Sequence, residues 1–326
     1  MKAIISEKYG TPDTLKLAEV AKPTPKQNQV LVKVHAASMN YGNLALLTGK
    51  PLPVRFAFGL RKPKYRIPGG DVAGVVEAKG ENVTQFQIGD RVYGDLSSSG
   101  WGAFAEYVAV DENALAIMPS NLGFTEMAGV PMAGTTALQA IRDIGKVKAG
   151  QHVLIHGASG GVGTFAVQIA NALGAEVTAV VSTRNVDLVK SLGADHVIDY
   201  RKEEFVNADE TFDVIFGVNG LQSISTYKRK LKEHGVFIHV GGATSQFYQT
   251  LLVGPLISLF GKKIFLSFMQ KANQSDLVFM NGLIEEGKVK PVIDRSYTLS
   301  EVPKAFQYFE EGHSRGKVVI TVGDEE

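Results

Sequence analysis

The sequence predicts a two-domain α/β protein, in which a mostly β domain precedes a domain built on a doubly wound parallel sheet. Its 326 residues suggest about two domains at roughly 150 residues each. The first 120 or so residues carry short β-like runs separated by turn signals. Further along the chain, short apolar strands alternate with helical segments, which is the pattern of a parallel sheet.

Short β-like runs without helical periodicity characterise the N-terminal part. Turn signals such as Pro68-Gly69-Gly70 and Gly89-Asp90 separate them, and the combination predicts a bent barrel. The predicted strands are Gln29–His35, Asp71–Glu77, Asp90–Gly94 and Phe104–Val110.

The central part changes to alternating strands and helices after a helical stretch from about Thr125 to Ile144. Each strand is nearly all apolar, which indicates that both faces of the sheet are covered. The predicted strands are Val153–His156, Val177–Val181, His196–Tyr200, Asp213–Phe216 and Val236–Val240. The C-terminal part adds helices around Asp276–Glu286 and Val302–Glu311 and a strand Lys317–Val322.

The composition excludes several classes of protein. The absence of cysteine removes disulfides, thiolate metal sites and cysteine nucleophiles. The formal net charge of +1 creates no overall field that favours nucleic acid or an acidic membrane surface. The N-terminus lacks the apolar core of a signal peptide. The most apolar stretch, Thr250 to Phe260, is shorter than the about 20 residues that span a bilayer. We therefore expect a cytoplasmic protein that is not inserted in a membrane.

The segment Ala158-x-Gly160-x-x-Gly163 is a variant of the dinucleotide fingerprint, with alanine at the first glycine position. It follows a predicted strand and opens a predicted helix, which is the context that this motif requires. A side chain at Gly160 would keep the backbone away from a pyrophosphate, and the free N–H groups of the helix N-terminus favour phosphate. The alternative is a tight strand-to-helix turn that binds nothing.

The end of the next strand, Val181-Ser182-Thr183-Arg184, carries no carboxylate. An NAD site usually places Asp or Glu about 20 residues after the glycines, where it accepts from the ribose 2′-hydroxyl. Ser182 can instead donate to a 2′-phosphate, and Arg184 can pair with it as a fork. The sequence therefore favours NADPH as the cofactor. The alternative for Arg184 is a solvated residue at a helix start.

The chain resembles the medium-chain dehydrogenase/reductase superfamily, and most closely its quinone oxidoreductase branch, which is related to zeta-crystallin. The resemblance rests on motifs spread along nearly the whole chain. They are Pro68–Gly74, Gly89–Gly94, Pro131–Leu138, the run from His156 to Tyr200 that includes Leu192–Tyr200, and Gly316–Val319.

The resemblance implies a GroES-like, mostly β catalytic domain that is discontinuous, formed by residues 1–122 and 268–326. A Rossmann NADP-binding domain, residues 123–267, would be inserted between these parts, with the active site in the cleft. The resemblance also implies a homodimer, in which the strand Lys263–Phe268 pairs across a two-fold axis; the alternative is an internal edge strand. Together with the motif analysis it gives as cofactor contacts Thr135, Ser159, Gly160, Gly161, Val162, Gly163, Ser182, Arg184, Tyr200, Gly241, Phe268, Arg315 and Lys317.

Zinc is not expected in this protein. Zinc-dependent members of the superfamily use a catalytic cysteine and a Gly-His-Glu motif, whereas this chain has no cysteine and places Gly70 and Asp71 where the His and Glu would be. Its seven histidines show no metal-ligand spacing. Zinc-assisted alcohol oxidation is therefore disfavoured.

Without a metal, the enzyme must transfer hydride by placement and electrostatics. Asn40 and Tyr41 are the predicted catalytic residues: Asn40 would donate to an acceptor oxygen, and Tyr41 would orient it or donate a proton. The alternative is that Asn40 caps a turn and Tyr41 packs. Asn43 departs from the family, which often has Asp there. The basic and apolar segment Arg55–Arg66 forms either one lip of the cleft or a solvated loop.

The predicted function is NADPH-dependent reduction of a quinone or an α,β-unsaturated carbonyl, because such acceptors are already electron-poor. Two alternatives stay open at this point. One is a metal-free alcohol or aldehyde oxidoreductase, and the other is an NADPH-binding sensor or scaffold protein without turnover. No nucleic acid or membrane partner is expected, and the substrate is a small molecule.

Overall fold

The structure is a computed structural model that describes residues 1–202, 210–220, 222–241, 249–251, 254–255, 257–259 and 261–323. The chain forms two compact units. Unit 1 comprises Met1–Thr135, Ala272–Glu286 and Pro291–Glu326, and unit 2 comprises Thr136–Lys271 and Gly287–Lys290. These limits differ from the boundaries expected at 122/123 and 267/268, and they add a short return of the chain to unit 2 at Gly287–Lys290.

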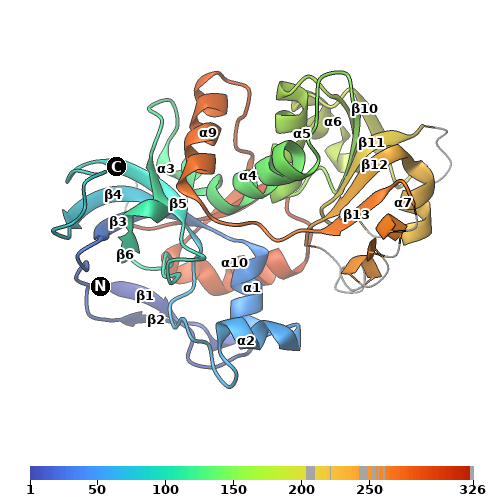
Figure 1. Ribbon diagram of the computed structural model, residues 1–326. Helices are drawn as coiled ribbons and strands as arrows, with labels where there is room; N and C mark the ends of the chain where they lie inside the picture. The colour runs from blue at the N-terminus through green and yellow to red at the C-terminus, as the bar shows by residue number, and fades with distance from the viewer. Residues whose placement is uncertain are drawn as a thin grey trace. The chain divides into compact units, whose positions relative to one another are not determined.

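Unit 1 is mostly β, as predicted. Its main sheet has the order β14-β15-β3-β4-β5-β7, with β6 paired to β3. Strands β1 and β2 form a separate antiparallel pair (Figure 1). All the pairs of the main sheet are antiparallel except β14–β15. The strands are β1 (Lys2–Ile5), β2 (Lys16–Glu19), β3 (Gln29–Ser38), β4 (Asp71–Lys79), β5 (Arg91–Asp95), β6 (Tyr107–Asp111), β7 (Leu115–Ile117), β14 (Ile293–Thr298) and β15 (Lys317–Thr321).

The core of unit 1 follows from the alternation of side chains along these strands. Val30, Val32 and Val34 of β3 lie at every second position and are all buried in one cluster, as period-two patterning requires. Phe306 from the C-terminal part of the chain is fully buried in the same cluster, where its ring meets Phe104 edge-on at 6.2 Å. The two ends of the chain therefore share one hydrophobic core.

Short helices complete unit 1 and lead into unit 2. The helical stretch expected from Thr125 to Ile144 is divided, because Pro131 lacks the N–H that would continue a helix from the preceding turn. The helices are α1 (Tyr41–Thr48), α2 (Arg55–Phe58), α3 (Phe124–Ala128), α4 (Pro131–Leu138), a π-helical turn (Gln139–Ile144), α9 (Gln274–Glu285) and α10 (Val302–Glu310), with 3₁₀ turns at Pro12–Thr14, Leu52–Val54, Glu112–Ala114 and Leu299–Glu301.

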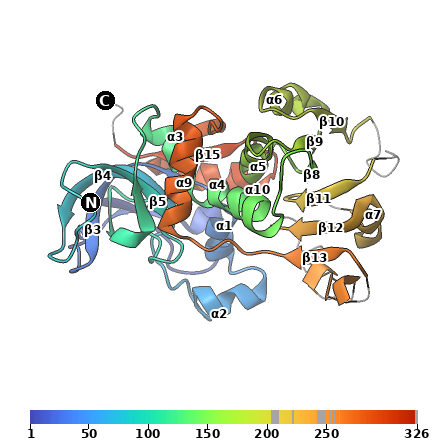
Figure 2. The same cartoon turned by 45° about the horizontal axis from the view of Figure 1, so that its top comes forward.

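Unit 2 contains a six-stranded parallel sheet with the order β10-β9-β8-β11-β12-β13, which can be followed from strand to strand in Figure 2. Counted from β8, this is the order 3-2-1-4-5-6 of the Rossmann fold, so the predicted fold class is confirmed. The strands are β8 (His152–His156), β9 (Glu176–Val181), β10 (His196–Asp199), β11 (Phe212–Gly217), β12 (Leu231–His239) and β13 (Ile264–Ser267).

The helices of unit 2 connect the strands of this sheet. They are α5 (Gly161–Ala172), α6 (Val186–Ser191) and α7 (Ile224–Lys230), with a 3₁₀ turn at Thr183–Asn185. Strand β8 is fully buried at Val153, Leu154 and Ile155, which explains why its sequence is continuously apolar rather than alternating. Within the described ranges, no helix combines the length and the apolar character needed to cross a bilayer.

Candidate active site

The predicted dinucleotide turn lies at the carboxyl end of β8, in the middle of the sheet of unit 2. The neighbours of β8 are β9 on one side and β11 on the other, so this is the point at which the strand order reverses. Open parallel α/β sheets bind their ligands at that point. The chain turns from β8 through Gly157–Gly160 into α5, as the motif predicted.

The glycines of this turn have two different physical roles. A Cβ on Gly163 would lie 2.2 Å from the carbonyl oxygen of Gly157, so only glycine allows α5 to pack this closely on the turn. A Cβ on Gly160 would find no atom nearer than 3.8 Å, so the space at the start of the helix is open. The first N–H groups of α5 have no acceptor within the helix and are available to a phosphate. The turn therefore fits the pyrophosphate of a dinucleotide.

Asn185 connects the dinucleotide turn to the end of β9. Its Nδ2 donates to Ser159 Oγ at 2.9 Å and to Ser182 Oγ at 3.2 Å, while the residue is only 4% exposed. Two predicted cofactor contacts are thus held by one buried amide that sequence reasoning missed. Asn185 follows Arg184 directly, but nothing in that spacing shows that its side chain turns inward.

The end of β9 places Ser182 half-buried and Arg184 exposed, and Tyr200 follows the adjacent strand β10. The Tyr200 backbone N–H donates to the carbonyl of Val181 at 3.0 Å, and Tyr200 is 51% exposed. The structure therefore brings Ser182, Arg184 and Tyr200 to the ends of two neighbouring strands. Arg201 lies beside them, with its guanidinium 5.8 Å from the centroid of the Tyr200 ring.

A carboxylate that the sequence analysis did not consider lies at this edge. Asp199 pairs in register with Val181 and is 7% exposed. Burial opposes ionisation, but hydrogen bonds from the Thr183 side chain and the Arg201 backbone, together with the nearby Lys202 and Arg201 charges, lower the pKa of Asp199. Lys202 Nζ is 3.8 Å from its carboxylate. Asp199 Oδ1 accepts from the Arg201 backbone N–H at 3.1 Å, whereas the buried Oδ2 has no hydrogen-bond partner among the described residues and has the Lys202 charge nearby.

Two buried histidines stand at the carboxyl ends of β8 and β12. His156 and His239 are both in register with Gly217 on the strand between them. His156 Nδ1 is 3.0 Å from the Tyr227 hydroxyl. Burial lowers the pKa of each imidazole to about 4, so both rings are neutral at neutral pH. They supply polar but uncharged groups beneath the dinucleotide site.

The remaining predicted contacts in unit 2 lie at the far strands of the same edge. Gly241 follows β12 with a left-handed φ of 63°. Phe268 follows β13, is half-buried, and donates its backbone N–H to the His239 carbonyl at 3.0 Å. The predicted residues of unit 2 therefore share the carboxyl edge of its sheet.

In unit 1, Asn40 lies between two buried, oppositely charged groups. Its Nδ2 donates to Asp71 Oδ2 at 2.8 Å, and its Oδ1 accepts from Lys317 Nζ at 2.6 Å. Asp71 is fully buried and Lys317 is 2% exposed, and their charged atoms are 3.5 Å apart. Ser38 Oγ also donates to Asp71 Oδ2 at 2.7 Å. The orientation of the Asn40 amide is thus fixed on both sides.

Lys317, which was expected to contact the cofactor, lies in the same buried cluster. Its ammonium donates to the Met39 carbonyl at 3.0 Å and to Asn40, and it faces Asp71. An ammonium has three N–H donors, and these three contacts account for them. Burial lowers the pKa of Lys317, while the Asp71 and Asp95 charges raise it. In the structure Lys317 partners Asp71, and its contact with the cofactor stays a prediction.

Helix α1 begins next to this ion pair, with Asn40 as its N-cap residue and Asn43 at the third helical position. The Asn43 Oδ1 accepts from the Asn40 backbone N–H at 2.8 Å. Only an oxygen acceptor is needed for this bond, so Asn43 supplies what the Asp of many family members would supply. Tyr41 is 50% exposed, which makes it accessible rather than packed. The open alternatives for this segment thus divide: Asn40 does stand at a helix N-cap, as the structural alternative has it, whereas Tyr41 is exposed rather than packed.

The space next to Gly70 is filled by other side chains. A Cβ on Gly70 would lie 3.1 Å from the Trp101 ring and 3.2 Å from the Met132 methyl, so a histidine there would have to displace both. Trp101 is 4% exposed and meets Phe58 edge-on at 5.6 Å. Among the residues that the structure describes, no group of three or more metal-binding His, Asp or Glu side chains occurs.

Two further predicted contacts, Thr135 and Arg315, also belong to unit 1. Thr135 is 1% exposed and its hydroxyl donates to the Pro131 carbonyl at 2.7 Å within α4. Arg315 is exposed, immediately before β15. Neither position by itself assigns a cofactor contact, and both remain predictions.

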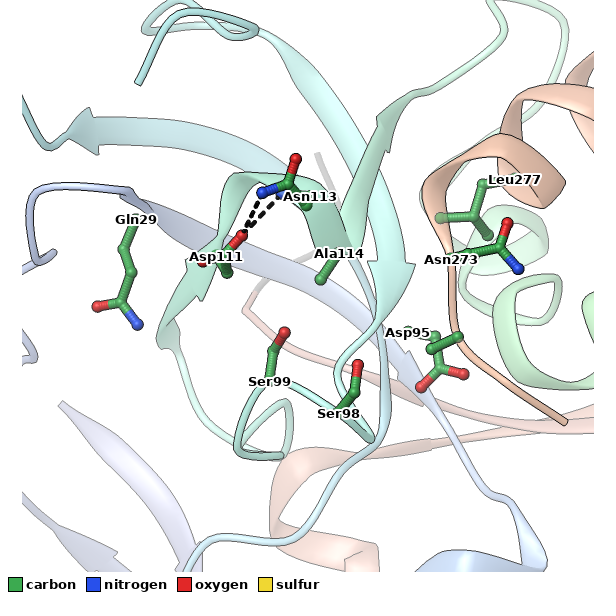
Figure 3. A pocket seen from close by; sticks show the side chains of 10 residues that line it. Gln29, Asp95, Ser98, Ser99, Asp111, Asn113, Ala114, Asn273 and Leu277 are labelled. Carbon is green, nitrogen blue, oxygen red and sulfur yellow. Dashed lines mark hydrogen bonds between the residues drawn. The ribbon is translucent and has the colours of Figure 1, made fainter. Parts of the chain in front are cut away.

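Unit 1 also contains a polar cavity of about 480 Å³, and none of the predicted site residues lines it (Figure 3). Its walls carry the carboxylates of Asp95 and Asp111 and the hydroxyls of Ser98 and Ser99, with Leu277 on one side. No lysine or arginine lines it. Carboxylates without cations repel phosphates, so this cavity does not suit a dinucleotide.

Comparisons with known protein families place both parts of the chain. Residues 26–120 match the alcohol dehydrogenase GroES-like domain, and residues 192–320 match the zinc-binding dehydrogenase family. The words zinc-binding in the second name describe the family as a whole. This chain has no cysteine that could supply a thiolate ligand to zinc.

Individual relatives match over nearly the full chain. The chain is 36% identical to 2-methylene-furan-3-one reductase from Solanum lycopersicum, across 98% of this chain and 79% of that protein. It is 35% identical to the chloroplastic NADPH-dependent alkenal/one oxidoreductase of Arabidopsis thaliana, with the same coverage. Among solved structures, the quinone oxidoreductase from Coxiella burnetii matches with a TM-score of 0.87 and 31% identity, covering 99% of each chain.

These relatives correct one expectation. The sequence analysis expected a cytoplasmic protein, because the N-terminus has no signal peptide. Several relatives at 33–35% identity are named as chloroplastic or mitochondrial proteins, which contradicts that expectation. The absence of a secretory signal excludes only one of several destinations, so the inference from it was too narrow.

Proposed function

Since the chain belongs to the medium-chain dehydrogenase/reductase superfamily, in its zinc-independent quinone oxidoreductase branch, we propose that it reduces a quinone or an α,β-unsaturated carbonyl with NADPH. The observation that carries the proposal is the open glycine turn at Gly160, at the point of the sheet where the strand order reverses. Relatives named as an NADPH-dependent alkenal/one oxidoreductase and as quinone oxidoreductases support the same reaction class.

The cofactor would be held at the carboxyl edge of the sheet of unit 2. The N-terminus of α5 and its N–H groups would receive the pyrophosphate, with Ser159 fixed by Asn185 beside it. Ser182, Arg184 and Tyr200 would surround the 2′-phosphate, and Gly241 and Phe268 would lie toward the nicotinamide half. When bound, the reduced nicotinamide supplies the hydride.

The preference for NADPH over NADH rests on charge. Arg184, Arg201 and Lys202 are all exposed at the ends of β9 and β10, so this edge carries three cations. Asp199, a carboxylate at this edge, accepts from Thr183 and Arg201 and does not replace a ribose-binding acid in the turn after β9. A 2′-phosphate is attracted to such an edge, whereas a plain ribose gains little from it.

Direct binding measurements test the cofactor assignment. Arg184→Ala should weaken NADPH binding by about tenfold, the lower end for a charged hydrogen bond at an exposed site, and should leave NADH binding nearly unchanged. Arg229→Ala, an exposed arginine on α7, is the matched control. Equal affinity of the wild-type protein for NADH and NADPH would refute the charge argument.

The acceptor would be oriented by groups of unit 1. Asn40 has two amide hydrogens, and only one is used by Asp71, so the other can donate to an acceptor oxygen. The exposed Tyr41 hydroxyl can supply a proton to the reduced product. Tyr41→Phe should therefore lower kcat with a quinone or enone and leave NADPH affinity unchanged.

Turnover assays separate the reaction classes. The absorbance of NADPH should fall when a quinone or an enone is added, and alcohols should not reduce NADP⁺ at a comparable rate. Oxidation of alcohols as the faster reaction would favour the metal-free alcohol oxidoreductase. Tight NADPH binding without turnover over a broad acceptor panel would favour a sensor or scaffold protein.

We also propose that the protein is a homodimer formed through β13. This strand is the last in the sheet order, and its outward residues Ile264 and Leu266 are 42% and 40% exposed. An edge strand with exposed apolar residues pairs readily with a second copy. Light scattering should give twice the mass of one chain, and Leu266→Lys should shift it toward the monomer.

A further inference from the structure

The segment Lys50–Arg66 is unlike the rest of the chain in charge. It holds six of the 34 lysine and arginine residues and none of the 33 aspartate and glutamate residues. The remainder of the chain therefore has 28 basic against 33 acidic residues, and the segment alone makes the total positive. We call this segment the basic loop. For its part Arg55–Arg66, two alternatives are open from the sequence: one lip of the cleft or a solvated loop.

Large apolar side chains protrude from the basic loop into solvent. Leu52, Phe56 and Leu60 are 68%, 83% and 63% exposed. Leu52 and Phe56 lie four residues apart in continuous helical backbone, because the 3₁₀ turn Leu52–Val54 runs directly into α2, and residues at this spacing share one face. Figures 1 and 2 both show α2 at the outer margin of unit 1, beyond α1.

The cations of the basic loop surround these apolar residues. Arg61, Lys62 and Lys64 are exposed, and the loop itself contains no acid to neutralise them. Two other arginines are engaged locally: Arg55 Nε donates to the Gly49 carbonyl at 3.1 Å, and Arg66 pairs with Glu7 at 3.1 Å. The loop thus combines three protruding apolar side chains with the exposed cations Lys50, Arg61, Lys62 and Lys64.

The basic loop is anchored to unit 1 rather than attached loosely. Tyr9 donates its hydroxyl to the Gly59 carbonyl, and the Arg55 guanidinium lies 4.6 Å from the Tyr9 ring centroid. Phe58, the half-buried aromatic of α2, packs edge-on against Trp101. These contacts fix the backbone of the loop with its apolar side chains exposed. Little conformational entropy of the backbone therefore remains to be lost on binding.

We propose that the basic loop is a docking surface for an anionic lipid bilayer, with Leu52, Phe56 and Leu60 inserted among the lipids. Exposed apolar side chains flanked by cations, with no acidic residue, are the composition of interfacial membrane anchors. The three side chains project individually instead of lining a groove, so a fluid acyl layer can receive each one. Charge complementarity selects acidic headgroups over neutral ones.

This inference goes beyond the proposed reaction and does not depend on it. Peripheral docking departs from the expectation of no membrane partner. That expectation rested on the net charge of +1, which does not show that six cations and no acid are concentrated in the basic loop. If the acceptor is a lipid-soluble quinone or enone, docking brings unit 1 to the phase in which that acceptor dissolves. Phe58 and Trp101 connect the loop to Gly70, next to the buried Asp71 that holds Asn40.

Sedimentation with vesicles tests the proposal on the full chain without substrate. The protein should sediment with phosphatidylcholine vesicles that contain phosphatidylglycerol, should remain in solution with pure phosphatidylcholine, and should be released by salt. Phe56→Ser should weaken binding by at least about tenfold, because a large apolar side chain is lost from the lipid phase. Replacing Arg61, Lys62 and Lys64 by Gln should weaken it on the order of a hundredfold, at roughly fivefold for each cation.

Matched variants outside the loop provide the controls. Ile88→Ser removes an apolar side chain that is 67% exposed elsewhere in unit 1. Replacing the exposed Lys16, Lys148 and Lys190 by Gln removes the same charge. Both control proteins should bind anionic vesicles like the wild type, and thermal melting should show every variant folded. The proposal is overturned if the wild type does not bind anionic vesicles at low salt, a result that would favour an acidic protein as the partner of the loop. It is also overturned if the loop variants and the control variants lose binding equally.

Discussion

The buried pair of Asp71 and Lys317 is the feature of unit 1 whose removal has the most predictable energetic effect. Lys317→Met keeps the aliphatic volume but leaves the Asp71 carboxylate buried without its counter-charge. Removing one partner of a buried pair typically costs about 3–5 kcal/mol. Ser38, Asn40 and the Met132 backbone N–H, at 2.7, 2.8 and 3.1 Å, still donate to that carboxylate. We therefore expect the lower end, about 3 kcal/mol of unfolding free energy.

Guanidinium unfolding followed by tryptophan fluorescence measures this loss in unit 1 alone. The chain has a single tryptophan, and Trp101 is buried in unit 1 at 4% exposure, so its emission reports when that unit opens. The exposed Lys304, which pairs with Glu301 at the start of α10, supplies the control. Lys304→Met should leave the unfolding midpoint unchanged, because exposed ion pairs contribute little.

A double-mutant cycle decides whether the pair acts as a unit. Asp71→Asn combined with Lys317→Met removes both charges, so the double variant should be more stable than Lys317→Met alone, with a coupling energy of about 2 kcal/mol or more. Additive single-variant effects would refute the reasoning. A Lys317→Met protein as stable as the wild type would refute it as well.

Two further predictions concern unit 2. The His156 and His239 imidazoles have folded pKa values near 4 against about 6.5 when unfolded, so the unfolded chain binds more protons between these values. Stability of unit 2 should therefore fall as the pH drops from about 6.5 to 4, by about 3 kcal/mol from His156, and hydrogen exchange of unit 2 peptides across that range should show it. Gly163→Ala should abolish NADPH binding and destabilise unit 2, because its Cβ would lie 2.2 Å from the Gly157 carbonyl oxygen. Gly282→Ala, which meets no atom within 4 Å in the middle of α9, should instead stabilise unit 1 by about 0.5–1 kcal/mol, as a melting curve would reveal.

The fold could be predicted because its strands are marked by local patterns. Continuous apolar runs indicated the parallel strands of unit 2, and a short β-like run without helical periodicity indicated β3. Errors arose where the partner of a segment lies far along the chain. The strand expected from Phe104 begins only at Tyr107, because the Phe104 N–H donates to Pro68 and Ala105 bridges to Ala3 instead of to the main sheet.

The candidate site was predictable only where one short motif carries it. The glycine turn and the Ser182–Arg184 segment have known spacing, and the structure brings them to one sheet edge. Asn185 was missed because many asparagines follow strands, and only the fold shows that this one turns inward to Ser159 and Ser182. Lys317 was placed from a motif, but its partner Asn40 is 277 residues away and could not be read from spacing.

The contacts of Asn40 explain how a site of this kind can orient an acceptor without zinc. A neutral amide that rotates freely is a poor donor, because fixing its N–H toward the acceptor costs conformational free energy. Here Lys317 holds the amide oxygen and Asp71 holds one amide hydrogen, so the second hydrogen points in one direction. Donors that are fixed before the reaction require no reorganisation during it. A histidine at position 70, as in zinc-dependent members, would have to displace Trp101 and Met132. The residue that follows Gly70 is Asp71, so the packing that excludes this zinc ligand adjoins the ion pair that holds the Asn40 amide.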